Sequence, residues 1–188
     1  MQYTENEYEK LVERQQTSEE IFDGKVLHVF KDNVELPNGG SAVREVVRHI
    51  GAVCIVPVKD DGNIILERQF RYVTGQVLTE IPAGKLDFTD EVPLDAAKRE
   101  LKEETGYTAE NWTELGIFYP TPAYSDEKIT MFLATGLTGG EQKLDKDEFL
   151  NCFEVPLKDA YEKVMNGEIT DSKTQIGILK AVNILHLI

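Results

Sequence analysis

Apolar and polar residues alternate in two short segments near the start of the chain, and this pattern predicts a β-hairpin. The segments are Lys25–Lys31 (KVLHVFK) and Val43–His49 (VREVVRH), and the turn-forming sequence PNGG lies between them. Because successive side chains of a strand point to opposite faces, each segment is expected to bury only one face. The chain before this hairpin starts with a polar segment.

Longer apolar runs follow the hairpin and indicate further strands. Gly51–Val58 (GAVCIVPV) is continuously apolar, which is typical of a central strand, and the turn sequence DDGN leads from it into a strand at Ile64–Phe70. The other predicted elements are strands near 78–81, 112–119, 128–134 and 149–155 and two closing helices near 157–166 and 172–187. Strands and helices in this mixed order predict an α/β (α+β) fold.

The helix with the strongest boundary signals is expected at about Pro93–Thr105. A proline in the first turn and Gly106 just past the end are typical helix boundaries, and Asp90 or Glu91 is expected near the N-cap. The core face of this helix is expected to carry Leu94, Ala97 and Leu101.

Three carboxylates are concentrated near the end of this helix. Glu100, Glu103 and Glu104 stand at positions i, i+3 and i+4, so their side chains share one face. Like charges in this arrangement repel one another, and a bound cation would compensate them. Ligands that are all carboxylate oxygens suit hard ions such as Mg²⁺, Mn²⁺ or Ca²⁺. Taken alone, the same face could also be a solvated surface.

The charge balance limits the classes of partner. The 188 residues include 34 Asp and Glu against 20 Lys and Arg, which gives a formal net charge of −14. A field of this sign repels nucleic-acid polymers and anionic membrane surfaces, but it leaves room for a small phosphate ligand held by a metal ion and a few arginines. For most of the acidic residues, solubility alone is a sufficient reason.

The lack of a recognisable targeting signal and the setting of the two cysteines predict a cytoplasmic protein. The first twenty residues are charged and lack the apolar region of a secretory signal, and no apolar stretch approaches the length of a membrane span. Cys54 and Cys152 lie in apolar, strand-like runs, where free thiols behave as small hydrophobic groups. We expect both to be buried and reduced.

The region around the acidic helix resembles the Nudix signature, G-x5-E-x7-R-E-U-x-E-E-x-G-U, in which U is apolar. One spacing differs, since six residues rather than five separate Gly84 from Glu91, while the seven-residue gap from Glu91 to Arg99 agrees. We interpret this difference as one extra loop residue; the alternative is that Asp90 replaces the glutamate. The resemblance implies a Nudix-type α/β/α sandwich around a mixed β-sheet. The matching residues are Gly84, Glu91, Arg99, Glu100, Leu101, Glu103, Glu104, Gly106 and Tyr107.

The resemblance also implies a reaction and a set of catalytic residues. Nudix enzymes hydrolyse the pyrophosphate of a nucleoside diphosphate linked to another group, and bound Mg²⁺ or Mn²⁺ supplies the Lewis acid and activates water. By resemblance, Glu100 and Glu104 are the principal metal ligands, with Glu103 and the backbone carbonyl of Ala83 beside them. Arg99 is expected to pair with a neighbouring glutamate and to fix its orientation.

Three further segments resemble the ADP-ribose pyrophosphatase branch of the superfamily. They are VELPNGGSAVREVVRH, ERQFRYVTGQVLTEIPAGKL and YPTPAYSDEKI, and Pro122 in the last resembles a marker of ADP-ribose specificity. The branch implies a small nucleoside diphosphate sugar as substrate, with ADP-ribose hydrolysed to AMP and ribose 5-phosphate. Two alternatives stay open: hydrolysis of another nucleotide (NADH, a dinucleoside polyphosphate or a nucleoside triphosphate), and a non-catalytic module that senses ADP-ribose.

The branch places further site residues outside the signature. Arg44 and Arg71 resemble arginines that contact the substrate's phosphates or terminal ribose, and Glu80 is a further expected substrate-binding residue. The alternative is that either arginine is a surface residue paired with Glu45 or Glu80. A further carboxylate, acting as base or metal ligand, is expected in the acidic loop 141–148. Its candidates are Asp145, Asp147 and Glu148.

The branch resemblance implies that the chain has two sections and that it forms a homodimer. Residues 1–50 would form an N-terminal β-hairpin section outside the Nudix domain at 51–188. This section is expected to take part in the interface of a homodimer.

Overall fold

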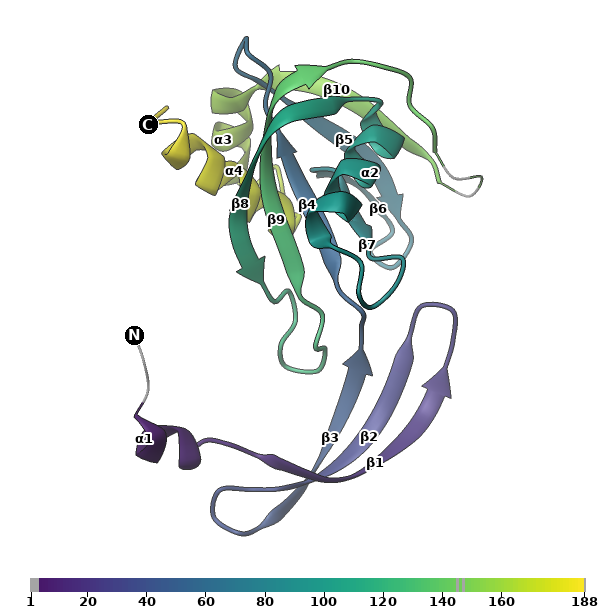
Figure 1. Ribbon diagram of the computed structural model, residues 1–188, viewed down its shortest axis with the longest axis vertical. Helices are drawn as coiled ribbons and strands as arrows, with labels where there is room; N and C mark the ends of the chain where they lie inside the picture. Colours follow the sequence, from purple (N-terminus) through teal and green to yellow (C-terminus); the bar gives the residue numbers. More distant parts are fainter. Residues whose placement is uncertain (1–3, 145, 147, 188) are drawn as a thin grey trace. The chain divides into compact units, whose positions relative to one another are not determined.

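The computed structural model describes residues 4–144, 146 and 148–187 (Figure 1). The chain divides into two compact units. The first contains the residues up to His49 together with Thr121–Glu127, and the second contains Ile50–Pro120 and the residues from Lys128 onward. The loop Thr121–Glu127 is therefore part of the first unit although it lies far beyond residue 50 in the sequence.

The first unit is a three-stranded antiparallel sheet preceded by a short helix. The predicted hairpin is confirmed, since its two strands pair in antiparallel register. The sequence did not reveal the strand before it, because that strand is exposed along its whole length and shows no apolar face. The elements are the helix α1 (Glu5–Glu9) and the strands β1 (Arg14–Asp23), β2 (His28–Glu35) and β3 (Ser41–Arg48), paired in the order β1-β2-β3.

The second unit contains two sheets and three helices. The first sheet is mixed, because β4 and β9 run parallel and the other pairs are antiparallel. In spatial order its strands are β7 (Ala83–Lys85), β4 (Ala52–Pro57), β9 (Ile129–Thr138) and β8 (Thr108–Phe118). The second sheet is antiparallel and contains β10 (Leu150–Pro156), β5 (Asn63–Arg71) and β6 (Gln76–Glu80). The helices are α2 (Pro93–Thr105), α3 (Leu157–Met165) and α4 (Ser172–Ile184).

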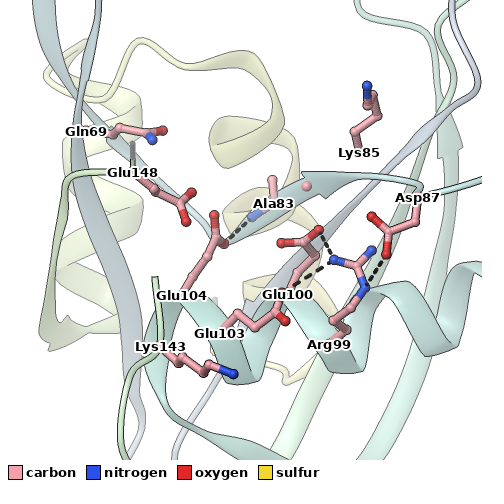
Figure 2. A pocket seen from close by; sticks show the side chains of 11 residues that line it. Gln69, Ala83, Lys85, Asp87, Arg99, Glu100, Glu103, Glu104, Lys143 and Glu148 are labelled. Carbon is pink, nitrogen blue, oxygen red and sulfur yellow. Dashed lines mark hydrogen bonds and ion pairs between the residues drawn. The ribbon is translucent and has the colours of Figure 1, made fainter. Parts of the chain in front are cut away.

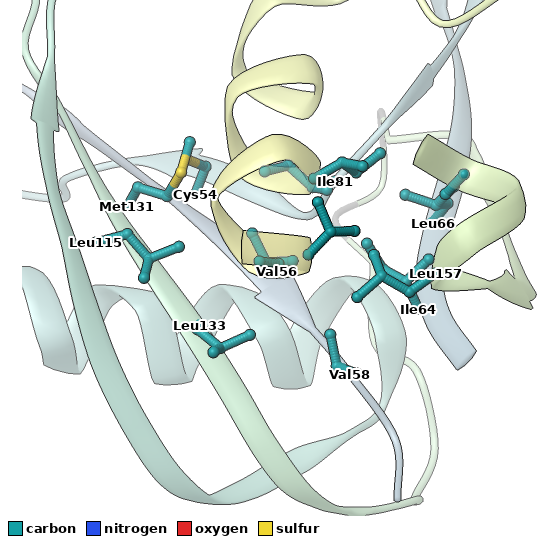
Figure 3. Close-up of a cluster of buried hydrophobic side chains, with 14 of the residues drawn as sticks. Cys54, Val56, Val58, Ile64, Leu66, Ile81, Leu115, Met131, Leu133 and Leu157 are labelled. Carbon is teal, nitrogen blue, oxygen red and sulfur yellow. The ribbon is translucent and has the colours of Figure 1, made fainter. Parts of the chain in front are cut away.

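Helices cover both faces of the mixed sheet, which explains why β4 is continuously apolar. On one face, Val53 and Ile55 pack with α2 residues such as Leu101. On the other face, Cys54 and Val56 belong to a larger core that includes residues of α3 and α4 (Figure 3). The structure thus has the expected α/β/α arrangement. No helix of the described residues combines the length and the apolar character that a membrane span requires.

The strand β5 follows the predicted turn but does not pair with β4 as a hairpin. Both edges of β4 are already occupied by β7 and β9, so only an isolated bridge joins Val58 and Ile64. The chain instead leaves the mixed sheet, and β5 becomes the central strand of the second sheet, between β10 and β6. This crossing is important for the site, because it places one face of β5 near α2.

The helix α2 has the predicted bounds but a different N-cap. Val92 occupies the N-cap position and no side chain caps the helix, so neither Asp90 nor Glu91 has the expected role. Glu91 accepts a hydrogen bond from the backbone N–H of Asp87 instead (2.7 Å). At the other end, Gly106 has φ +76°, a left-handed conformation that favours glycine and stops the helix.

Candidate active site

The acidic face of α2 borders a cleft of about 360 Å³ (Figure 2). The cleft brings together the three helix glutamates and Ala83, which the sequence analysis proposed as metal ligands, with Arg99 and with Glu148 from the acidic loop. The residues that line it are Gln69, Ala83, Gly84, Lys85, Asp87, Arg99, Glu100, Glu103, Glu104, Lys143 and Glu148.

Gly84 allows α2 to approach β7 closely. A Cβ atom at this position would lie 2.1 Å from the carboxyl carbon of Glu100, much closer than any real contact. The space that a side chain would occupy is therefore filled by the Glu100 carboxylate. Glycine at this position of the signature is explained by this contact between helix and strand.

Glu104 is the most deeply buried of the three helix glutamates, with 3% of its surface exposed. Its carboxylate accepts a hydrogen bond from the backbone N–H of Ala83 (2.9 Å), which fixes it against β7. Burial raises the pKa of Glu104 to about 10, and the neighbouring charges of Glu67, Glu100 and Glu148 add to this effect. A proton or a cation is therefore needed at this position at neutral pH.

Arg99 holds a group of carboxylates at the outer part of the cleft. Its guanidinium donates to Glu100 at 2.7 Å and lies 3.3 Å from both Asp87 and Glu91. A longer contact of 3.4 Å reaches Glu103. The predicted role of Arg99, pairing with a neighbouring glutamate, agrees with these contacts. Burial raises the pKa of Glu100, and the charge of Arg99 opposes this rise.

Glu67 on β5 is an acidic residue that the sequence analysis did not single out. Its side chain is 1% exposed, and burial raises its pKa to about 8. Within the described part of the chain, its Oε2 atom has no hydrogen-bond partner. The available signal was the strand periodicity, because Glu67 lies two residues after Ile65 and therefore faces the same side as a buried isoleucine.

The composition of the cleft fits a hard divalent cation. All side chains proposed as ligands carry carboxylate oxygens, and the buried Glu104 has no cationic partner within 4 Å among residues 4–144, 146 and 148–187. Across the same residues, no three Asp, Glu, His or Cys side chains already surround a common ion position. The carboxylate of Glu100 is bonded to Arg99.

Arg71 and Glu80 form a pair away from the lining of this cleft. Glu80 is 1% exposed and accepts two hydrogen bonds from Arg71, each 2.7 Å long, and a further one from Lys173. Despite burial, these two cations hold the pKa of Glu80 below its usual value. This pairing is the alternative that the sequence left open for Arg71. Contacts of Arg71 and Glu80 with substrate stay predictions.

The remaining expected residues divide between the first unit and the acidic loop. Arg44 lies on β3, where it pairs with Glu13 (2.8 Å) and not with its neighbour Glu45. Pro122 is exposed in the loop Thr121–Glu127 of the first unit. Their substrate contacts stay predictions. Of the loop carboxylates, Glu148 lines the cleft, and the other two candidates, Asp145 and Asp147, lie outside the described residues.

Comparisons with known proteins agree with this geometry. A family model described as "NUDIX domain" matches residues 47–174. The chain is 45% identical over 170 residues to a Bacillus subtilis protein named ADP-ribose pyrophosphatase, covering 89% of this chain and 91% of the relative. It is 40% identical over 163 residues to a Bacillus methanolicus protein named methanol dehydrogenase activator, covering 86% and 88%.

A solved structure supports the same assignment. It is described as an ADP compounds hydrolase and superposes with a TM-score of 0.82 at 25% sequence identity, covering 93% of this chain and 94% of the other. The matching family model spans most of the chain and includes the whole acidic helix. With relatives that align over nearly the full length, the chain belongs to the Nudix hydrolase family.

Proposed function

We propose that this Nudix hydrolase cleaves the pyrophosphate of ADP-ribose, or of a similar nucleoside diphosphate sugar, to give AMP and ribose 5-phosphate. The observation that carries the proposal is the cleft that holds every glutamate of the α2 signature beside Ala83 and Arg99. The similarity to a protein named ADP-ribose pyrophosphatase and to a structure described as an ADP compounds hydrolase supports this choice of substrate.

In the proposed mechanism, Glu100, Glu103 and Glu104 would hold Mg²⁺ or Mn²⁺ together with the Ala83 carbonyl. A divalent cation bound there would neutralise charge on the pyrophosphate and supply Lewis acidity. Arg99 keeps Glu100 oriented toward the cleft through the hydrogen bond at 2.7 Å.

The acidic loop supplies the proposed base. Glu148 lines the cleft, and this position supports its carboxylate as the group that accepts a proton from the attacking water. Figure 2 shows the carboxylates of Glu148 and Glu104 pointing toward each other, and this proximity contributes to the raised pKa of Glu104. Asp145 and Asp147 remain the alternative candidates for the same role.

A second candidate function follows from the relative named methanol dehydrogenase activator. In that case the chain would act on a partner enzyme, and the cleft would either bind a nucleotide as a sensor or hydrolyse it as part of the regulation. The complete set of helix glutamates favours hydrolysis, because a module that only binds nucleotide has no need of five carboxylates around one cleft.

We also propose a homodimer in the cytoplasm, with the interface formed by residues 1–50. The first unit supports this assembly because β1 is exposed along its whole length and carries the exposed apolar side chains of Ile21 and Phe22. The two cysteines are free thiols, which suits a reducing compartment. Sedimentation of the full chain tests the dimer: a mass near twice 21.2 kDa is expected, and the monomer mass contradicts it.

The experiment that tests the proposed function is a comparison of substrates in the presence of Mg²⁺. ADP-ribose, ADP-glucose, NADH, diadenosine polyphosphates and nucleoside triphosphates are supplied separately, and the products are separated by chromatography. We expect ADP-ribose to have the highest kcat/KM and to give AMP and ribose 5-phosphate. Faster turnover of another substrate would replace ADP-ribose, and binding without turnover of any substrate would favour the sensor.

A further inference from the structure

We propose that Glu67 is a further ligand of the divalent cation and contacts it from the side of β5, together with Glu104. This inference rests on the proposed function, since it assumes that the cleft holds a cation. It adds a residue of the second sheet to a ligand set that otherwise comes from α2, β7 and the acidic loop.

The position of Glu67 in the second sheet directs its side chain toward the end of α2. Glu67 lies on the central strand, directly opposite Cys152 of β10 and Glu80 of β6, and residues opposite each other in an antiparallel sheet share one face. The Cys152 Sγ atom lies 3.3 Å from the backbone oxygen of Glu104, so this face contacts the last turn of α2. Gln69, two residues further on the same face of β5, lines the cleft.

The neighbouring Glu80 shows how this fold compensates a buried carboxylate that has a structural role. Glu80 is as buried as Glu67, and it receives hydrogen bonds from both Arg71 and Lys173. Lys173 also lies 3.2 Å from Asp171. The cations on this side of the sheet are therefore committed to Glu80 and Asp171.

Glu67 has no such direct contacts with a cation among the described residues, and the more distant charges of Lys173 and Arg71 oppose only part of the rise in its pKa. No Lys, Arg or His nitrogen of the described chain lies within 4 Å of its carboxylate, and its Oε2 atom lacks a donor. Its acidic neighbour Glu104 has the backbone N–H of Ala83 as a partner but no cation. Two buried carboxylates near each other without a cation are unfavourable unless an ion is bound between them or one stays neutral. An ion bound by both removes the repulsion and uses the free Oε2 atom.

The test measures binding of Mn²⁺ alone to the full chain, from the decrease of the free-ion signal in electron paramagnetic resonance. Glu67→Gln keeps the volume of the side chain and removes its charge. We expect it to weaken Mn²⁺ binding about tenfold or more, which is typical for loss of a group in or next to a metal's ligand set. Glu162→Gln, an exposed glutamate on α3, is the matched control and should bind Mn²⁺ like the unchanged chain.

A structural role gives a different result. If Glu67 is a neutral glutamic acid, glutamine imitates it closely, and unchanged Mn²⁺ affinity in Glu67→Gln would overturn the inference. Thermal unfolding without metal checks the fold, and we expect Glu67→Gln to unfold at the same temperature as the unchanged chain or higher, because it removes a repulsion. If Glu67→Gln does not fold, Glu67→Met takes its place, because methionine has a similar volume and lacks both carboxylate oxygens. An unchanged Mn²⁺ affinity in Glu67→Met would also overturn the inference.

The same titrations separate this inference from the proposed function. Glu104→Gln is measured in parallel. If the unchanged chain does not bind Mn²⁺, or if Glu104→Gln binds it equally well, the proposed cation site itself fails. If Glu104→Gln loses binding while Glu67→Gln retains it, only the role of Glu67 fails.

Discussion

Raising the pH from 5 to 7 should destabilise the metal-free protein through Glu67 and Glu104. Burial raises the pKa of the Glu67 and Glu104 carboxyls to about 8 and about 10, from an ordinary value of 4.5. The folded chain therefore binds more protons than the unfolded chain throughout this range. The free energy of unfolding falls with pH wherever the folded state holds the extra proton. The stability that this proton contributes is therefore fully present below pH 4.5 and is lost as the pH rises toward the pKa values of the folded state.

The magnitude follows from one proton held by this pair of neighbouring carboxyls. For one proton that the folded chain holds and the unfolded chain does not, each pH unit changes the free energy of unfolding by about 1.4 kcal/mol, so this free energy should fall by about 3 kcal/mol between pH 5 and pH 7. For a chain of this size, such a change lowers Tm by about 10 °C. Saturating Mg²⁺ should oppose the fall at pH 7, because it replaces the proton and binds only the folded state.

Thermal unfolding in the presence of a chelator at pH 5, 6 and 7 measures this effect. Other groups also titrate in this range, so the comparison is with Glu104→Gln, which removes one member of the pair and should show a clearly weaker dependence on pH. Glu162→Gln should keep the dependence of the unchanged chain. Equal slopes for the unchanged chain and Glu104→Gln would refute the reasoning.

Three substitutions test other parts of the account. Gly84→Ala should lower kcat/KM about tenfold or more, because its Cβ displaces the Glu100 carboxylate, whereas Gly139→Ala, whose Cβ has only ordinary contacts, should leave it unchanged in the same assay. Arg99→Lys should lower kcat about tenfold, because an ammonium group cannot serve several carboxylates as the planar guanidinium does; steady-state kinetics at saturating Mg²⁺ with an unaltered kcat would argue against this role. Leu101→Ala should lower the free energy of unfolding by about 3 kcal/mol, measured in urea, since its side chain is fully buried between α2 and the sheet; a loss below about 1 kcal/mol would contradict that packing.

The sequence predicted best the elements whose signals are local. The bounds of α2 follow from a proline in the first turn and from Gly106 in a left-handed conformation, both within a few residues of the helix ends. The signature glutamates share one face because helical spacing alone determines this. The structure then brings Glu100, Glu103 and Glu104 to one cleft with Ala83 and Arg99.

Features that depend on distant partners were not predictable in the same way. The strand β5 leaves β4 because β7 and β9 occupy both edges of β4, and no local pattern encodes that competition. The first strand, β1, was missed because both of its faces are polar or exposed. Periodicity alone could place Glu67 on an inward face, but its lack of a contacting cation becomes visible only when Arg71 and Lys173 are seen to bind Glu80.

The most direct test of the central claim is Mg²⁺-dependent hydrolysis of ADP-ribose by the unchanged chain and by Glu104→Gln, with products identified by chromatography. The account predicts AMP and ribose 5-phosphate from the unchanged chain and a decrease in kcat of more than about 100-fold in the variant, which loses a buried charge at the proposed cation site. If the unchanged chain does not hydrolyse ADP-ribose, or if the variant hydrolyses it at the same rate, the account is contradicted.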